Sequence, residues 1–137
     1  MLTRIDHVGI ACFDLEERIA FYAETFGLEA VHRETNNAQG VHEAMLYVAP
    51  GSYVQLLQPS RDDSPVGKFL ARHGEGVHHI GYGVDDVERA LDEIGAKGVP
   101  LVDSRPRHGS MGASIAFLHP KGVGGVLTEL VQAAPGR

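Results

Sequence analysis

Four polar side chains occupy matching places in two stretches of the sequence that resemble each other. His7 in "IDHVGIA" matches His79 in "VHHIGYG" at an offset of 72 residues, and Gln55 in "YVQLLQP" matches Glu129 in "VLTELVQ" at an offset of 74. Two imidazoles, a carboxylate and an amide oxygen form a nitrogen and oxygen donor set that suits a divalent transition metal. The pattern predicts a metal site with these four residues as its ligands.

The setting of Glu129 supports this interpretation. Leu127 and Val131 lie on the same face of the predicted strand, and a buried carboxylate between them is costly unless a cation compensates it. Taken singly, a histidine in a strand is more often a packed residue, and a glutamate there more often faces solvent. The repetition of all four positions favours ligation. The donor set suits Co²⁺, Mn²⁺, Ni²⁺, Fe²⁺ or Zn²⁺ without selecting one.

These positions belong to a longer internal repeat. Each half is predicted to form a strand, a helix and three further strands. In the first half the strands are Ile5–Cys12, Leu28–Glu34, Val41–Ala49 and Ser52–Gln58, and in the second they are Val77–Val84, Val99–Asp103, Ala113–His119 and Gly125–Gln132. The first helix is predicted to begin after Asp14 and to end at Gly27. The second is predicted to begin after Asp85 or Asp86 and to end at Gly95.

The predicted fold class is α+β, with two paired βαβββ modules. A half with a single helix cannot bury much core alone, so the chain is predicted to form one domain over residues 1–137. Module one spans 1–60, a linker spans 61–75, and module two spans 76–137. The linker is predicted to carry a short helix from about Pro65 to His73.

Composition excludes several classes of protein. The net charge of −6 argues against a nucleic-acid or anionic-membrane surface as the main partner. The single cysteine, Cys12, allows no disulfide within the chain and is expected to pack in the core. No apolar run reaches the length of a membrane span, and the N-terminus lacks a secretory layout. A cytoplasmic location is therefore expected.

Longer motifs carry a resemblance to a known family. The stretches "GVHEAMLYV", "YVQLLQP", "SPVGKFLARHGEGVHHIGYGVDD" and "SRPRHGSMGASIAFLHPKGVGGVLTELVQ" resemble the methylmalonyl-CoA epimerases of the vicinal oxygen chelate superfamily. The resemblance implies a half-open barrel around a metal ion, of which Co²⁺ is the expected one, and a homodimer. It implies interconversion of (R)- and (S)-methylmalonyl-CoA, with Glu43 as catalytic base and Glu129 as both ligand and second acid or base.

The chemistry of such a reaction fits these residues. Inversion at a carbon needs an acid or base on each face of a planar enolate. Glu43 shares strand parity with Val41 and Met45, so its carboxylate is expected to face inward. For the other face, Glu129 could act through its second oxygen, or a water or a neighbouring side chain could serve.

Other functions found in the superfamily are also compatible with parts of this sequence. A glyoxalase-type isomerase or lyase also removes a proton beside a carbonyl. An extradiol dioxygenase is disfavoured, because a fourth ligand at Gln55 leaves too few open positions for catechol and O₂. A non-enzymatic binding module would leave Glu129 and both histidines unexplained. The basic stretch "SRPRHGSMG" could close over the thioester, contact CoA phosphates, or be a solvated loop.

Overall fold

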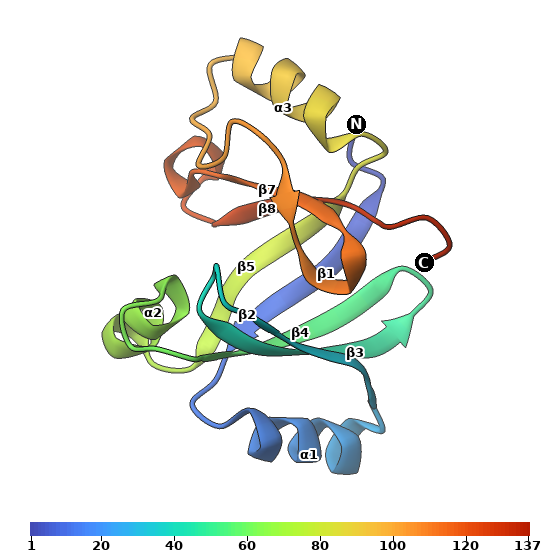
Figure 1. Ribbon diagram of the computed structural model, residues 1–137, viewed down its shortest axis with the longest axis vertical. Helices are drawn as coiled ribbons and strands as arrows, with labels where there is room; N and C mark the ends of the chain where they lie inside the picture. Colours follow the sequence, from blue (N-terminus) through green and yellow to red (C-terminus); the bar gives the residue numbers. More distant parts are fainter. The chain divides into compact units, whose positions relative to one another are not determined.

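The computed structural model describes residues 1–137, and the chain folds as two compact units. The first unit is His7–His78, and the second combines Met1–Asp6 with His79–Arg137. Both crossings between the units lie inside strands, Arg4–Ala11 (β1) and Gly76–Gly83 (β5), which Figure 1 labels. The division into modules 1–60 and 76–137 within a single domain stays a prediction.

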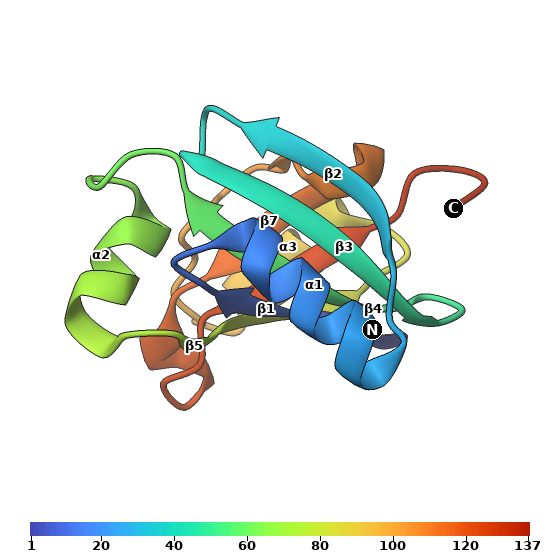
Figure 2. The ribbon, with the colours of Figure 1, turned by 90° about the horizontal axis from the view of Figure 1, so that it is seen from below.

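The first unit contains a four-stranded sheet in the order β2-β3-β4-β1. Its further elements are α1 (Leu15–Phe26), β2 (Ala30–Asn36), β3 (Val41–Ala49), β4 (Ser52–Pro59) and α2 (Pro65–His73). Strand β4 is parallel to β1 and antiparallel to β3. Helix α1 lies along one face of β3 and β4 (Figures 1 and 2), where Leu15 and Ile19 pack in a buried cluster with Leu56. The other face of these strands carries a second apolar cluster, in which Val41 and Leu57 pack against Leu70 of α2, and it also holds polar side chains.

The second unit repeats this plan in the order β5-β8-β7-β6. Its elements after β5 are α3 (Val87–Ala96), β6 (Arg107–His108), β7 (Ser114–Leu118) and β8 (Thr128–Gln132), with 3₁₀ turns at Ser110–Gly112 and Pro120–Val123. Strand β8 is parallel to β5 and antiparallel to β7. Helix α3 packs Val87 and Leu91 against Leu130. None of the helices is both long and apolar enough to cross a membrane.

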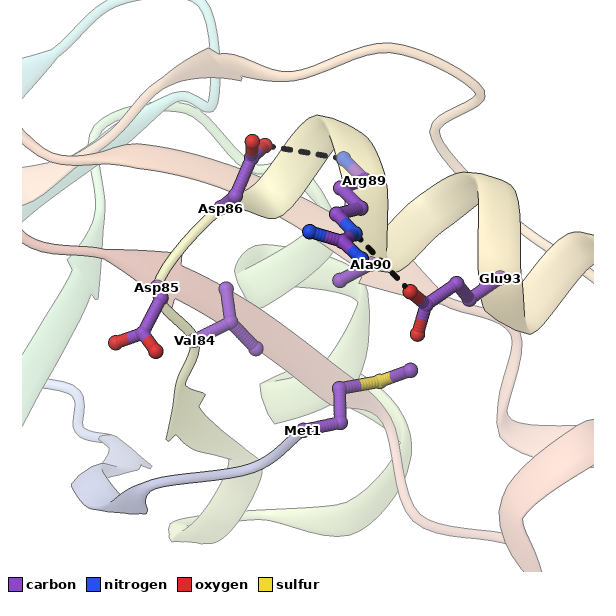
Figure 3. Close-up of a pocket in the computed structure, with 7 residues that line it drawn as sticks. All are labelled: Met1, Val84, Asp85, Asp86, Arg89, Ala90 and Glu93. Carbon is purple, nitrogen blue, oxygen red and sulfur yellow. Dashed lines mark hydrogen bonds and ion pairs between the residues drawn. The ribbon is translucent and has the colours of Figure 1, made fainter.

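The two long helices begin in the same way. Asp14 Oδ1 accepts a hydrogen bond from the Glu17 backbone N–H at 3.0 Å, and Asp86 Oδ1 accepts one from the Arg89 backbone N–H at 3.0 Å, drawn in Figure 3. These bonds satisfy amides that have no partner within the helix. The sequence therefore predicted the first cap correctly, and the structure selects Asp86 over Asp85 for the second.

A glutamine of the last strand of each half also holds a helix start. Gln58 Oε1 accepts from the Leu15 backbone N–H at 2.7 Å, and Gln132 Oε1 accepts from the Val87 backbone N–H at 3.0 Å. Both glutamines lie three residues after a predicted metal ligand. Helix and ligand-bearing strand are thus tied together by equivalent bonds in the two halves.

Two predictions for the second half were wrong. The segment predicted as a strand over Val99–Asp103 makes only an isolated bridge, at Leu101 with Leu118. Pro100 has no N–H to donate to a neighbouring strand. The Phe117 N–H donates to the carboxylate of Asp103 and not to a backbone carbonyl of this segment. Helix α3 also continues past Gly95 and ends at Ala96. The left-handed turn beyond it, which favours glycine, falls at Gly98.

Candidate metal centre

In the first unit, three polar side chains share one face of the sheet. Strand register places Gly9 of β1 opposite Gln55 of β4, and Met45 of β3 opposite the same glutamine. Because side chains alternate along a strand, His7, Gln55 and Glu43 project from the same face. Each is at most 5% exposed. The inward orientation that strand parity predicted for Glu43 is confirmed.

The amide of Gln55 has a defined orientation. Its Nε2 donates a hydrogen bond to Glu43 Oε2 at 3.1 Å. Since a carboxylate accepts and does not donate when ionised, this bond directs the Gln55 Oε1 away from Glu43. The Oε1 is buried and accepts no hydrogen bond in the protein. A buried amide oxygen of this kind is suited to bind a cation, because leaving it without a partner is costly.

The second unit holds the other two predicted ligands in the equivalent register. Gly81 of β5 lies opposite Glu129 of β8, as Gly9 lies opposite Gln55. His79 Nε2 lies 3.5 Å from Glu129 Oε1, and both residues are buried. The repeat seen in the sequence therefore extends to backbone register.

The protein contains a group of residues able to hold a metal ion. The potential ligand atoms of His7, His79 and Glu129 all lie within 4.8 Å of one another. Two imidazoles and a carboxylate are donors that suit a divalent cation preferring nitrogen and oxygen ligands.

One position breaks the repeat, and the sequence reasoning missed it. Glu43 lies opposite Leu57 in the β3–β4 pair, and Ile115 lies opposite Val131 in the β7–β8 pair. Ile115 thus holds the place of Glu43 in the second half, and it is buried and apolar. Extending the offset of 72 residues from position 43 would have found this. Each half of the repeat contains two predicted ligands, but only the first half has an acidic residue at the position of Glu43.

The other candidate polar residues are exposed or contact side chains other than the predicted ligands. His42, expected on the face opposite Glu43, contacts Thr35 Oγ1 through Nδ1 at 2.8 Å. In the basic stretch 104–112, Arg105 and His108 are exposed. Arg107 is exposed too, and its Nε lies 3.2 Å from Asp103 Oδ2.

A separate surface pocket lies at the start of α3 (Figure 3). Asp85, Asp86 and Glu93 contribute to its lining, and Arg89 in the same wall forms an ion pair with Glu93 at 3.3 Å. None of the predicted ligands lines it. Its carboxylates are accounted for by the helix cap and the ion pair, apart from Asp85, and the pocket is not part of the candidate metal centre.

Comparison with known proteins places the chain in a family. The model of the glyoxalase/bleomycin resistance protein/dioxygenase superfamily matches residues 6–117. A Streptomyces coelicolor methylmalonyl-CoA epimerase variant in complex with 2-nitronate-propionyl-CoA is 54% identical, with a TM-score of 0.94 over 98% of this chain and 99% of that chain. A methylmalonyl-CoA epimerase in complex with methylmalonyl-CoA and NH₄⁺ gives the same identity and TM-score, over 98% and 97% of the two chains.

A relative known from sequence agrees with these structures. The ethylmalonyl-CoA/methylmalonyl-CoA epimerase of Cereibacter sphaeroides is 36% identical over 134 residues, covering 96% of this chain and 99% of the relative. These likenesses confirm the predicted α+β fold of the vicinal oxygen chelate type. The chain belongs to the glyoxalase/bleomycin resistance protein/dioxygenase superfamily and, within it, to the methylmalonyl-CoA epimerase family.

Proposed function

We propose that this chain is an epimerase that interconverts (R)- and (S)-methylmalonyl-CoA by removing and returning the α-proton. The observation that carries this proposal is the likeness, over 98% of the chain, to an epimerase solved with methylmalonyl-CoA. These relatives do not favour the glyoxalase-type isomerase or the non-enzymatic binding module. The buried carboxylate and the metal-binding donor set described above are the groups that such a reaction requires.

The four ligands of the proposed metal centre are His7, Gln55, His79 and Glu129. When bound, a divalent cation supplies the Lewis acidity that stabilises negative charge on an enolate oxygen. Co²⁺ is the ion that the family resemblance favours, with Mn²⁺, Ni²⁺, Zn²⁺ and Fe²⁺ also suited to the donors. All four of these side chains are buried.

Glu43 is the proposed base for one face of the substrate. Its carboxylate is buried, and the Gln55 amide holds one of its oxygens in place. The other Glu43 oxygen is then directed by the planar geometry of the carboxylate. Glu43 removes the α-proton on its side, and as the acid it returns a proton in the reverse direction.

The proposed acid or base for the opposite face is Glu129. The repeat offers no second copy of Glu43, since Ile115 stands in that place. Glu129 is a buried carboxylate of the same half, with one oxygen 3.5 Å from His79 Nε2. Its other oxygen would exchange the proton. Because a bound cation makes a carboxylate a weaker base, proton transfer by Glu129 is expected to be slower than proton transfer by Glu43.

Three broader features complete the proposal. The chain acts as one domain over residues 1–137, with modules 1–60 and 76–137 joined by a linker at 61–75. It works as a homodimer in the cytoplasm. The substrate is a small-molecule thioester, in keeping with the acidic net charge of −6, which disfavours nucleic acid as a partner.

The proposal is tested by exchange with solvent deuterium. (R)- or (S)-methylmalonyl-CoA is incubated with metal-loaded protein in D₂O, and NMR follows deuterium at the α-carbon together with the configuration. Wild type is expected to give exchange and inversion. Glu43→Gln is expected to reduce both rates by about 10²-fold or more, while it keeps the shape of the side chain and an oxygen that can accept from Gln55.

Glu24→Gln, an exposed glutamate on α1, is the matched control and is expected to leave the rates unchanged. Metal content is measured on every variant. If Glu43→Gln epimerises at the wild-type rate, Glu43 is not the base. If wild type gives neither exchange nor inversion while loaded with metal, the proposed activity itself is refuted.

A further inference from the structure

An aromatic ring contacts one of the proposed ligands of the second unit. The ring of Phe117 meets the imidazole of His79 edge to face, with centroids 5.5 Å apart and planes at 81°. Phe117 is also opposite Glu129 in the β7–β8 register. Phe117 is therefore a neighbour of both ligands of this unit, and it is buried.

The backbone of Phe117 is fixed by the segment that fails to form a strand. The N–H groups of Val102 and Asp103 both donate to the Phe117 carbonyl, at 3.0 and 3.1 Å, and the Phe117 N–H donates to Asp103 Oδ2 at 2.9 Å. Because these groups point toward residues 102–103, Phe117 and Glu129 form a non-hydrogen-bonded pair of the antiparallel ladder. Side chains approach more closely in such pairs.

The ring itself is held by a cation. The guanidinium carbon of Arg107 lies 5.4 Å from the centroid of the Phe117 ring, and Arg107 Nε lies 3.2 Å from Asp103 Oδ2. The same Asp103 oxygen thus contacts both Arg107 and the backbone of Phe117. A cation over an aromatic face is favourable by roughly 0.5–1 kcal/mol when exposed, and by more when desolvated.

The first half has a different residue at the register position of Phe117. Met45 lies opposite Gln55 as Phe117 lies opposite Glu129. A methionine is flexible and fills space without defining an orientation.

We infer that Phe117, held by Asp103 and Arg107, is a positioning residue that fixes the imidazole of His79 in the orientation needed to bind the metal ion. The inference rests on the proposed function, because it concerns the same metal centre. An imidazole fixed before binding loses less conformational freedom when the ion binds. Residues that orient a metal ligand typically change metal affinity 10- to 100-fold when they are replaced.

The test is a Co²⁺ titration of metal-free protein, without substrate, followed by the visible absorption of the bound ion. Phe117→Met, which installs the residue of the first half, is expected to weaken Co²⁺ binding about 10-fold and to change the absorption spectrum. Arg107→Met, which keeps an apolar stem but removes the charge, is expected to weaken binding by a smaller factor. Urea unfolding of each variant shows whether it folds.

Arg18 and Phe21 on α1 provide matched controls. The guanidinium carbon of Arg18 also lies 5.4 Å from the Phe21 centroid, and Arg18 also pairs with a carboxylate, Glu75, at 3.3 Å. Phe21→Met and Arg18→Met are expected to bind Co²⁺ as wild type does.

Unchanged affinity and spectrum in both folded test variants would overturn the positioning role while leaving the metal centre intact. If Phe117→Met does not fold, the result for Arg107→Met decides, since that side chain is 41% exposed. If wild type itself binds no Co²⁺, the proposed metal centre fails and this inference fails with it. Exchange kinetics in D₂O then report separately on the proposed activity.

Discussion

At the scale of single residues, the two halves differ at two positions where chemistry is expected. Positions 43 and 115 are equivalent in strand register, yet one is a buried glutamate and the other a buried isoleucine. Positions 55 and 129 are also equivalent, and there the difference is between an amide and a carboxylate. Each half therefore carries one buried acidic residue among these four positions, at a different place. This arrangement suits a reaction that needs one acid or base on each side of a planar substrate.

Cys12 shows a different outcome for a chemically reactive residue. Its thiol is buried and lies 3.5 Å from the Leu57 carbonyl oxygen. Burial, aided by the negative charge of Glu75, raises the pKa of Cys12 from 9.0 to about 11. A thiol with so little thiolate at neutral pH is a poor nucleophile. The packing role predicted from the sequence agrees with this environment.

We therefore predict slow alkylation of native Cys12. At pH 8, iodoacetamide is expected to react about 10²-fold more slowly with the folded chain than with the chain in urea, since the folded thiol is about two pKa units less acidic. Mass spectrometry of quenched samples measures the rate. Between pH 9.0 and about 11 the folded chain keeps a proton that the unfolded chain loses, so the free energy of unfolding is expected to fall as pH rises through this window. Equal rates in the two states would contradict the prediction.

At the scale of elements, the glutamines that follow the ligand strands connect packing to the metal centre. Gln58 and Gln132 accept from the first backbone amides of α1 and α3. These glutamines are separated by the same 74 residues as Gln55 and Glu129. Periodicity alone could not assign them a role, because their acceptor oxygens become useful only when the helix start lies beside the strand end. Helix starts contribute stability mainly by satisfying such amides.

Replacing either glutamine is predicted to destabilise the protein by about 1 kcal/mol. Gln132→Leu and Gln58→Leu keep an apolar stem but leave a helix amide without its acceptor. Urea unfolding monitored by circular dichroism gives the change in the free energy of unfolding. Asp86→Ala, which removes the side-chain cap of α3, is expected to cost about as much. Midpoints that match wild type would show that water replaces the lost bonds.

At the scale of the whole molecule, metal binding and folding are expected to be linked. An ion that binds only the folded chain stabilises it by about 2.7 kcal/mol at a free concentration 100 times its Kd. We predict that Co²⁺ raises the Tm of metal-free protein, and that EDTA reverses the increase. Differential scanning calorimetry measures the change. His7→Ala is expected to remove most of it, whereas a full shift in that variant would exclude His7 as a ligand.

Much of this molecule could be predicted because the repeat carries the same information twice. Strand β3 and helix α2 match their predicted bounds, and the register of Gly9 with Gln55 recurs as Gly81 with Glu129. The failures occur where the halves diverge. At Pro100 and Asp103 an expected strand does not form, and the Asp103 side chain accepts a hydrogen bond from the Phe117 backbone. The periodicity of the sequence also does not reveal that the Phe117 ring contacts His79. Such contacts depend on tertiary packing, which local pattern does not encode.

The passage of the chain between its two units within β1 and β5 has a practical consequence. Proteases cut exposed, flexible segments and rarely cut strands whose amides are paired in a sheet. Limited digestion should therefore not release the units at the bonds that follow Asp6 and His78. First cuts are instead expected in connecting turns, so digestion is not expected to yield either compact unit intact.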